Sequence, residues 1–257
     1  MSDREYLNPI YVDAHTLPEA WFMLQKKIWE LNSYEYKVAH GSYIGMIRRE
    51  FDHVTCRIRR PDIRPLCETM FPSNCTFAPP TTPDQVEQYF NNYLMNSIVP
   101  EGTYYTYAER LVPQLLEVIR RYQTWGFRHA KASMSIAKPD DILMHRLPAN
   151  PGDPIDPDSR ASEPCLRGVT WKIRWDNISK VWRLHMYIYF RVWDLFGGFP
   201  ENLAGFQLVK EFMVKEIGPE PETGLPLEDG EMIVASPSLN VREHIFKFSK
   251  QVAGLEE

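Results

Sequence analysis

The sequence predicts an α+β fold in a single domain, and three observations support this. Apolar and polar residues alternate along 169–175 and 182–190, on either side of an Asp176-Asn177 turn, which is typical of a long β-hairpin. Elsewhere apolar residues recur at steps of three and four, as on the buried face of a helix. The 257 residues are enough for one large hydrophobic core, so residues 1–257 are expected to form one domain.

The N-terminal half contains segments of both kinds. A helix is expected from Leu17 onward, because Pro18 suits a first turn and apolar residues follow at helical spacing. Residues 45–60 alternate as a pair of strands and carry five arginines, of which Arg49 is a candidate substrate ligand, although charges are also ordinary on a solvated strand. Two further helices are expected, one from Pro83 or Asp84 and one that follows the tyrosines at 104–107.

The C-terminal half contains an irregular segment and a clearly patterned helix. Residues 138–164 are rich in proline, which predicts a surface excursion that could act as a lid. This excursion separates a short strand, 132–137, from the long hairpin. Pro200 then precedes a helix whose apolar positions are spaced for burial, and a last strand is expected over 232–235.

The composition bears on the class of partner. A net charge of −5 and a pI near 5.9 provide no general basic field for a nucleic acid polymer, so a small anion bound by local arginines is expected. No run of 18 apolar residues is present to cross a membrane, and the N-terminus lacks the apolar core of a signal peptide, so a cytoplasmic location is expected. The four cysteines form no C-x-x-C pair and are expected to be reduced thiols without a metal.

Cys165 is the candidate nucleophile. It follows Glu163-Pro164 at the entrance of a predicted strand. A thiolate becomes reactive when cationic groups lower its pKa, which Arg191 or Arg128 could do if the fold brings them close. The commoner role for a lone cysteine is that of a buried, inert thiol.

The order of the motifs around Cys165 favours the catalytic role. Besides Glu163-Pro-Cys165, the ordered set consists of Tyr105-Thr-Tyr107-Ala-Glu-Arg-Leu111, Phe127-Arg128-His129-Ala130, Arg191-x-x-Asp194 and Gly198-x-Pro200-x-Asn202. This set, over about residues 17–245, resembles the thymidylate synthase family and its pyrimidine-nucleotide hydroxymethylase branch. The resemblance implies a large, mostly antiparallel sheet with helices on one side, and a homodimer with shared active sites.

The resemblance also implies a role for each matching residue. Cys165 would attack C6 of a pyrimidine nucleoside monophosphate and make C5 a carbon nucleophile, which takes a one-carbon unit from 5,10-methylenetetrahydrofolate. Arg191 would bind the 5'-phosphate, and Arg128 would reach it from the partner subunit. Asn202 would read the pyrimidine edge.

Three more residues are implied near the reacting base. Glu87 is the candidate for the family's proton-shuttling glutamate, and Tyr107 would support the water network. Asp194 would lie over the face of the base or of the folate.

Departures from the family pattern bear on the substrate. The family's His-x-Tyr motif for the sugar is replaced by Ser238-Leu-Asn240-Val-Arg242, which offers Asn240 and Arg242 instead. His129 replaces the second arginine of the family's pair and Lys131 adds a charge nearby, which leaves a ribonucleotide substrate open. Asn202 indicates uracil, yet an amide can turn over and accept from a cytosine amino group.

The product is expected to carry a hydroxymethyl group. Synthases of the bacterial type have a tryptophan that helps keep water from the C5 methylene intermediate, and no Trp occurs here between Trp29 and Trp125, although Tyr104 or Tyr105 could fill this role. The predicted function is folate-dependent C5 hydroxymethylation of CMP, dCMP or dUMP. The alternatives are a thymidylate synthase that methylates dUMP and a nucleotide-binding homologue without catalysis.

Overall fold

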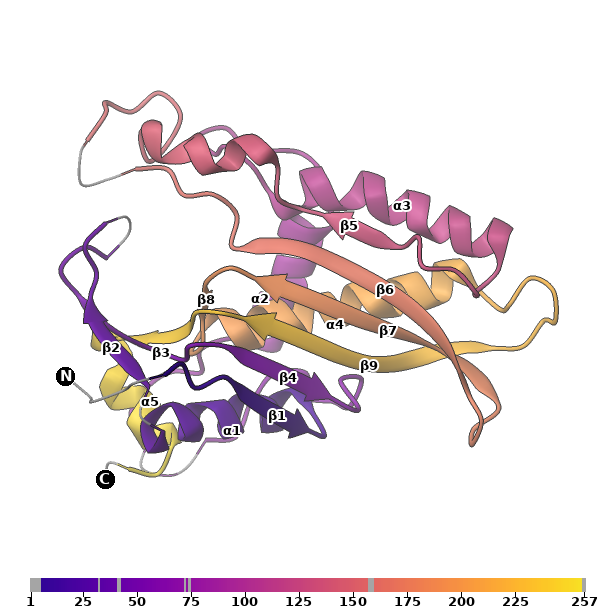
Figure 1. The fold of residues 1–257 in the computed structure, drawn as a ribbon, viewed down its shortest axis with the longest axis horizontal. Helices are drawn as coiled ribbons and strands as arrows, with labels where there is room; N and C mark the ends of the chain where they lie inside the picture. Colours follow the sequence, from indigo (N-terminus) through magenta and orange to yellow (C-terminus); the bar gives the residue numbers. More distant parts are fainter. Residues whose placement is uncertain are drawn as a thin grey trace.

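The computed structural model describes residues 6–31, 33–40, 43–71, 73, 75–156 and 160–255. These residues form a single α+β domain with a six-stranded sheet, a four-stranded sheet and five α-helices (Figure 1). The long hairpin of β6 and β7 runs along the middle of the molecule, with α3 and α4 beside and behind it (Figure 1).

The larger sheet has the strand order β1-β4-β9-β7-β6-β5. Its strands are β1 (Ile10–Ala14), β4 (Val54–Ile58), β5 (Ser133–Ser135), β6 (Leu166–Asp176), β7 (Val181–Phe190) and β9 (Leu227–Ser236). β1 pairs with β4 and β7 pairs with β9 in parallel, whereas the other neighbours are antiparallel. The sheet is therefore mixed, with three antiparallel and two parallel pairings. One parallel pairing arises because the chain crosses over through α4 between β7 and β9 and re-enters the sheet in the same direction.

The smaller sheet has the order β2-β3-β10-β8. Its strands are β2 (Tyr34–Lys37), β3 (Ile47–Glu50), β8 (Trp193–Asp194) and β10 (Leu239–Arg242). The expected pairing within 45–60 is wrong, because β3 pairs with β2 and β10 whereas β4 pairs with β1 and β9. Phe51, which is 2% exposed, is anchored by its amide to the carbonyl of Leu239, and the residues after it lead the chain into the other sheet.

The helices begin close to the predicted positions. They are α1 (Leu17–Glu30), α2 (Pro83–Tyr89), α3 (Tyr107–Trp125), α4 (Gly198–Ile217) and α5 (Phe246–Val252), with a π-helical turn η1 (Phe90–Leu94) after α2 and short 3-10 helices η2 (Pro139–Arg146) and η3 (Glu243–Ile245). Thr16, Thr82 and Thr106 each precede a helix and accept a hydrogen bond from the backbone amide three residues further on. These N-caps explain why α1, α2 and α3 begin where they do.

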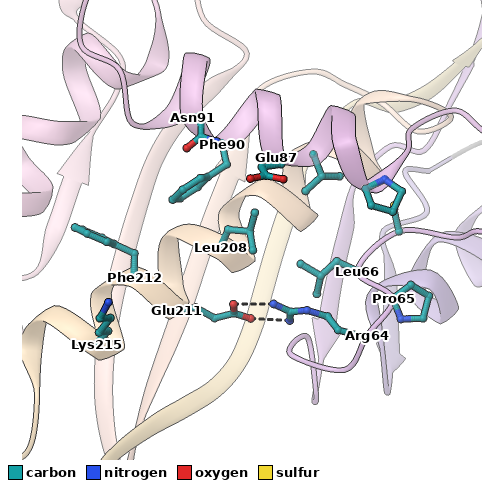
Figure 2. Close-up of a pocket in the computed structure, with 13 residues that line it drawn as sticks. Arg64, Pro65, Leu66, Glu87, Phe90, Asn91, Leu208, Glu211, Phe212 and Lys215 are labelled. Atoms are coloured by element: carbon teal, nitrogen blue, oxygen red, sulfur yellow. Dashed lines mark hydrogen bonds and ion pairs between the residues drawn. The ribbon is translucent and has the colours of Figure 1, made fainter.

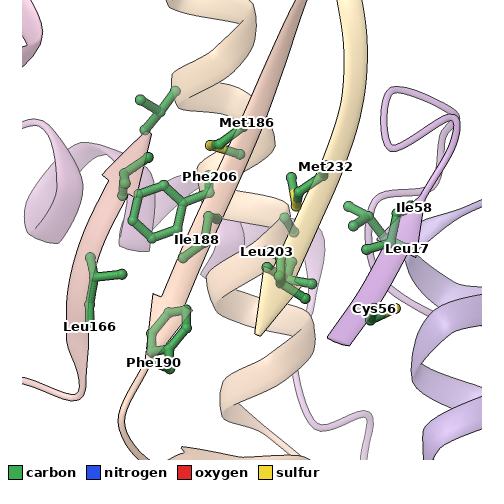
Figure 3. Packing of buried hydrophobic residues seen from close by; sticks show 14 of the residues in the cluster. Leu17, Cys56, Ile58, Leu166, Met186, Ile188, Phe190, Leu203, Phe206 and Met232 are labelled. Atoms are coloured by element: carbon green, nitrogen blue, oxygen red, sulfur yellow. The ribbon is translucent and has the colours of Figure 1, made fainter. Parts of the chain in front are cut away.

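One face of the larger sheet is buried and the other is open. On the buried face, Met186 and Ile188 of β7 lie with Phe206 of α4 in the hydrophobic core (Figure 3). The residues that alternate with them along β7, Tyr187 and Tyr189, line a hollow of about 550 Å³ on the open face. This alternation is what the period of two in the sequence predicted for the hairpin.

The excursion over 138–164 is fastened to the domain at several points. Arg110 of α3 forms a two-pronged ion pair with Asp141 of η2. The hydroxyl of Tyr104 donates to the carbonyl of Pro148 at 3.0 Å, and that of Tyr105 to the carbonyl of Ser162 at 3.4 Å. Residues 157–159 lie outside the described part, and a lid function stays a prediction.

Candidate active site

Cys165 and Arg191 lie at the paired ends of adjacent strands. Cys165 directly precedes β6, Arg191 directly follows β7, and Leu166 and Phe190 are partners in the antiparallel ladder between them. The amide of Arg191 donates to the carbonyl of Cys165 at 2.9 Å. The hairpin therefore brings the predicted nucleophile and the predicted phosphate ligand together.

The Arg191 guanidinium holds the loop that leads to Cys165. It donates to the carbonyl of Glu163 at 2.8 Å, the hydroxyl of Ser162 at 3.1 Å and the carbonyl of Pro164 at 3.3 Å. Its Nε also lies 3.2 Å from the Glu163 carboxylate. Nη1 makes no hydrogen bond within the described residues, so one edge of this half-buried guanidinium remains available for a ligand.

A group of tyrosines lies beside Cys165. The ring of Tyr93, from η1, is 4.9 Å from that of Tyr107, which is 6.3 Å from that of Tyr105. The hydroxyl of Tyr107 accepts a hydrogen bond from the amide of Leu166 at 3.3 Å. Burial, assisted by the charge that Cys165 would carry, raises the pKa of Tyr107 well above its usual range and that of Tyr93 to about 12. These phenols therefore stay protonated and can donate hydrogen bonds at neutral pH.

The electrostatic environment of Cys165 differs from the expectation. Burial raises the pKa of its thiol, and the charges of Arg191, Arg242 and Arg48 offset this only in part. The carboxylate of Glu163 raises the pKa further. Arg191 thus has the predicted influence on Cys165, but the free protein holds a thiol rather than an activated thiolate.

Arg128, the other cation predicted to act on Cys165, lies at the far end of the sheet. Its guanidinium is over the ring of Trp182, 5.2 Å from the centroid, and Trp182 pairs with Trp175 near the hairpin turn. That position is roughly 30 Å from the Cys165 end of β6, at about 3.3 Å per residue. Arg128 is therefore remote from Cys165 of the same chain.

His129 and Lys131 accompany Arg128 at this far end. The His129 ring stacks on Tyr122 with centroids 4.7 Å apart and meets Trp125 edge-on, and the Lys131 ammonium is 6.0 Å from the Trp125 centroid. Burial, with the charges of Arg121 and Lys131, lowers the pKa of His129, so its ring is neutral at pH 7. Neither side chain lies near Cys165 of its own chain.

Arg48, rather than Arg49, is directed toward the site. Arg49 donates to the carbonyls of Ile28 and Leu31 at 2.8 and 3.1 Å, at the end of α1, and is within 3.3 Å of the Glu35 carboxylate. Neighbouring residues of a strand point to opposite faces, and it is Arg48 whose charge acts on Cys165. Arg49 therefore stabilises the C-terminal end of α1 and does not lie at the site.

The polar face of the smaller sheet is defined by Tyr36, Arg48, Glu50, Asn240 and Arg242. Two of these residues, Arg48 and Arg242, act electrostatically on Cys165. Arg48 pairs with Tyr36 on one side and with Arg242 on the other, and Glu50 pairs with Asn240, so their side chains share one face. Asn240 and Arg242 were predicted near the ligand, whereas Tyr36, Arg48 and Glu50 were missed. Alternation along β3 could have indicated Arg48 and Glu50 together, had the pairing with β10 been known.

Asn202 and Asp194 lie at the start of α4. The indole Nε1 of Trp193 donates to Oδ1 of Asn202 at 2.9 Å. Oδ2 of Asp194 accepts from the amides of Gly197 and Gly198 at 2.8 and 2.9 Å. Asp194 therefore caps the first turn of α4, a structural role that the sequence analysis did not predict.

Glu87 lies in a different pocket from the tyrosines. It is exposed and lines a cavity of about 690 Å³ between α2, α4 and the loop at Arg64, together with Leu208 and Phe212 (Figure 2). Tyr89 is two residues further along α2 and so points roughly 200° away from Glu87 around the helix axis. It lies near Asn202, and its hydroxyl is buried and makes no hydrogen bond of normal geometry in the described part. The predicted placement of Glu87 beside the nucleophile is wrong, because the turn of the helix directs Glu87 into this other pocket.

Gly205 of α4 makes room for Tyr89. A Cβ atom built on Gly205 would be 2.6 Å from Cδ1 of Tyr89 and 3.1 Å from Cδ1 of Leu94. Only a glycine permits this close approach of α4 to the end of α2.

The described part of the chain shows neither a metal-binding cluster nor a membrane-spanning helix. It contains no group of three His, Cys, Asp or Glu side chains that could hold a metal ion. None of its helices is long and apolar enough to cross a membrane.

Comparisons with known proteins do not assign a family. A scan against models of protein families found no match to the chain, and a search of curated proteins found none either.

Proposed function

We propose that the chain is a thymidylate synthase-like enzyme that transfers a one-carbon unit, as a hydroxymethyl group, to C5 of a pyrimidine nucleoside 5'-monophosphate. CMP, dCMP and dUMP are the substrates that the resemblance implies. The observation that carries the proposal is the hydrogen-bonded junction of Cys165 and Arg191, with 2.9 Å between the Arg191 amide and the Cys165 carbonyl. A nucleotide has its reacting base and its phosphate one sugar apart, so one molecule can reach both.

In this mechanism Arg191 binds the phosphate and Cys165 forms a bond to C6. A phosphate would accept hydrogen bonds from the free edge of the guanidinium, at Nη1. It would compete with the Glu163 carboxylate for the Nε edge. Because burial raises the pKa of Cys165, its proton must leave as the nucleotide binds. The Tyr107 hydroxyl, which accepts from the Leu166 amide, keeps a proton to donate nearby.

The amide of Asn202, the residue proposed to read the base, is held in one orientation. Its Oδ1 accepts from the Trp193 indole, so turning the amide over would place an NH₂ group against another donor. The Nδ2 group lies toward the Tyr89 hydroxyl, and if a ligand drew it away it would suit the O4 acceptor of uracil better than the amino group of cytosine.

The residues near Cys165 suit a folate. Tyr93 and Tyr105 provide aromatic surface against which a flat pterin ring can pack, and the buried hydroxyl of Tyr89 is a donor without an ordinary hydrogen bond in the described part. When bound, 5,10-methylenetetrahydrofolate supplies the one-carbon unit. Tyr93, Tyr105 and Tyr89 are the residues that would hold it.

A homodimer would complete the site in this proposal. Arg128 is remote from Cys165 of its own chain, so its proposed contact with phosphate requires a second copy. The open sheet face around Tyr187 and Tyr189 is where that copy would pack. Arg128, His129 and Lys131 would then approach the neighbouring site.

The proposal is tested by incubating UMP, CMP, dUMP and dCMP with 5,10-methylenetetrahydrofolate and measuring product mass. We expect a gain of one CH₂O unit, and a gain of CH₂ with accumulation of dihydrofolate would instead identify a thymidylate synthase. Cys165→Ser should form no product, whereas Cys75→Ser, which changes another partly buried thiol, should retain activity. Folate-dependent turnover by Cys165→Ser would refute the proposal.

A nucleotide-binding homologue without catalysis is the second candidate. The raised pKa of Cys165 and the position of Glu87 outside the tyrosine group both favour it. Exchange of the C5 hydrogen of a bound nucleotide with solvent requires attack at C6, so observing this exchange would exclude the second candidate.

A further inference from the structure

The polar face of the smaller sheet contains a buried acceptor without a donor. Asn240 is 1% exposed, and its Nδ2 donates to the carbonyls of Trp193 at 2.9 Å and Ser238 at 3.0 Å. Both partners are acceptors, so the orientation of the amide is fixed. Its Oδ1 has no hydrogen-bond partner within the described residues. A buried acceptor left in this way is costly unless a ligand supplies a donor.

Glu50 provides a second free acceptor beside the first. Its Oε2 accepts from the hydroxyl of Ser238 at 2.5 Å and from that of Tyr36 at 3.2 Å. Its Oε1 accepts no hydrogen bond in the described part of the chain. Glu50 and Asn240 are direct partners on the antiparallel strands β3 and β10, so their side chains leave the sheet side by side on the same face.

Two arginines on the same strands connect this pair of acceptors to the nucleophile. Arg48 and Arg242, which pair with each other two residues along the same strands, both act electrostatically on Cys165. The Nε atoms of both arginines are buried and make no hydrogen bond within the described residues. This side of the face therefore also contains polar groups without a hydrogen-bond partner.

The chemistry of the pair selects its ligand. Two adjacent acceptors, one of them a carboxylate, require two adjacent donors, and a vicinal diol provides them. A phosphate supplies only acceptors and would be repelled by Glu50. A sugar with a single free hydroxyl would leave one of the two acceptors unfilled.

We propose that Glu50 and Asn240 bind the 2'- and 3'-hydroxyls of a ribose and make this site selective for ribonucleotides over deoxyribonucleotides. The inference rests on the proposed function, which places the base at Cys165 and the phosphate at Arg191 on either side of the sugar. Ser238 and Tyr36 are positioning residues, because their hydroxyls hold Oε2 and leave Oε1 for the ligand.

The experiment compares equilibrium binding of UMP, dUMP, CMP and dCMP, and of the base-free probes ribose 5-phosphate and 2-deoxyribose 5-phosphate, to the full chain. The ribose member of each pair should bind about tenfold tighter or more, as expected for one hydrogen bond to a charged group. Glu50→Gln should reduce this ratio toward one. Glu35→Gln is the matched control, because Glu35 lies on the next strand, is exposed and pairs with Arg49 on the opposite face.

The outcomes separate this inference from the proposed function. Equal or tighter binding of the deoxyribose members by the unmodified protein would overturn the inference and leave the proposed function standing. A ribose preference that Glu50→Gln does not change would also overturn it. Binding of ribose 5-phosphate in preference to its deoxy form, with no binding of any pyrimidine nucleotide, would instead support the diol site and refute the proposed function.

Discussion

Replacing Asp141 by Asn tests the fastening of the proline-rich excursion. Asp141 is 4% exposed and accepts from Nη1 and Nη2 of Arg110 at 2.6 and 2.9 Å and from the amide of Lys138 at 2.8 Å. Arg110 is itself buried, and its guanidinium lies 5.1 Å from the centroid of Tyr105. The substitution keeps the volume of the side chain but leaves the Arg110 charge without its partner.

The expected cost is large for a single substitution. Breaking a buried ion pair by removing one partner costs about 3–5 kcal/mol, and we expect about 3 kcal/mol because Asn retains one acceptor. A loss of this size lowers the melting temperature by about 6–12 °C for a domain of this length. Asp140→Asn is the matched control, because Asp140 is the exposed neighbour of Asp141 and should change the free energy of unfolding by about 0.5 kcal/mol or less.

The stabilisation that Asp141 contributes is expected to depend on pH. Burial of Asp141 opposes ionisation, but hydrogen bonds from Arg110 and the Lys138 amide, with the charge of Arg110, together hold the pKa of Asp141 below its ordinary value of 3.8. The stabilisation is therefore fully present above pH 3.8 and is lost as the pH falls through the lower pKa of the folded state. Denaturant unfolding at pH 7 and at successively lower pH should show the gap between wild type and Asp141→Asn narrowing below pH 3.8. Equal stabilities of Asp141→Asn and Asp140→Asn at pH 7 would refute the reasoning.

Three further substitutions probe the surroundings of the site. Glu163→Gln removes a charge that raises the pKa of Cys165, so iodoacetamide should alkylate this thiol at a lower pH than in the wild type. Mass spectrometry of the Cys165 peptide measures the alkylation, and an unchanged or higher pH would contradict the stated electrostatics. Gly205→Ala forces Tyr89 to move and should destabilise the fold by about 1–3 kcal/mol in denaturant unfolding, and wild-type stability would show that the contact is not tight. Arg49→Ala should lower the melting temperature while leaving nucleotide affinity unchanged, and a selective loss of affinity would restore Arg49 as a ligand.

The sequence was sufficient for elements with a strong period. The hairpin of β6 and β7 alternates over its full length, and the pairing of its two ends alone places Cys165 beside Arg191. The threonine caps and prolines likewise mark the starts of α1 and α2. These features are local, or follow from one hairpin, and so could be predicted.

The remaining features depend on contacts between distant segments. β3 alternates in the sequence, but nothing local shows that it pairs with β10 rather than with β4, and this pairing decides that Arg48 and Glu50 reach the site while Arg49 does not. Glu87 is a different case, because the apolar phase of α2 already placed Tyr89 on the buried side and Glu87 away from it. At this position the family motif and the helix period disagree, and the structure agrees with the helix period.

The most direct test of the central claim is solvent exchange of the C5 hydrogen in a bound pyrimidine nucleotide, followed by NMR. Exchange reports the bond between Cys165 and C6 without requiring the one-carbon transfer to be completed. We predict exchange of at least one of UMP, CMP, dUMP and dCMP by the wild-type protein and by Cys75→Ser, and none by Cys165→Ser. No exchange of any of the four nucleotides by the wild-type protein, or exchange by Cys165→Ser, would contradict the assignment of Cys165 as the nucleophile.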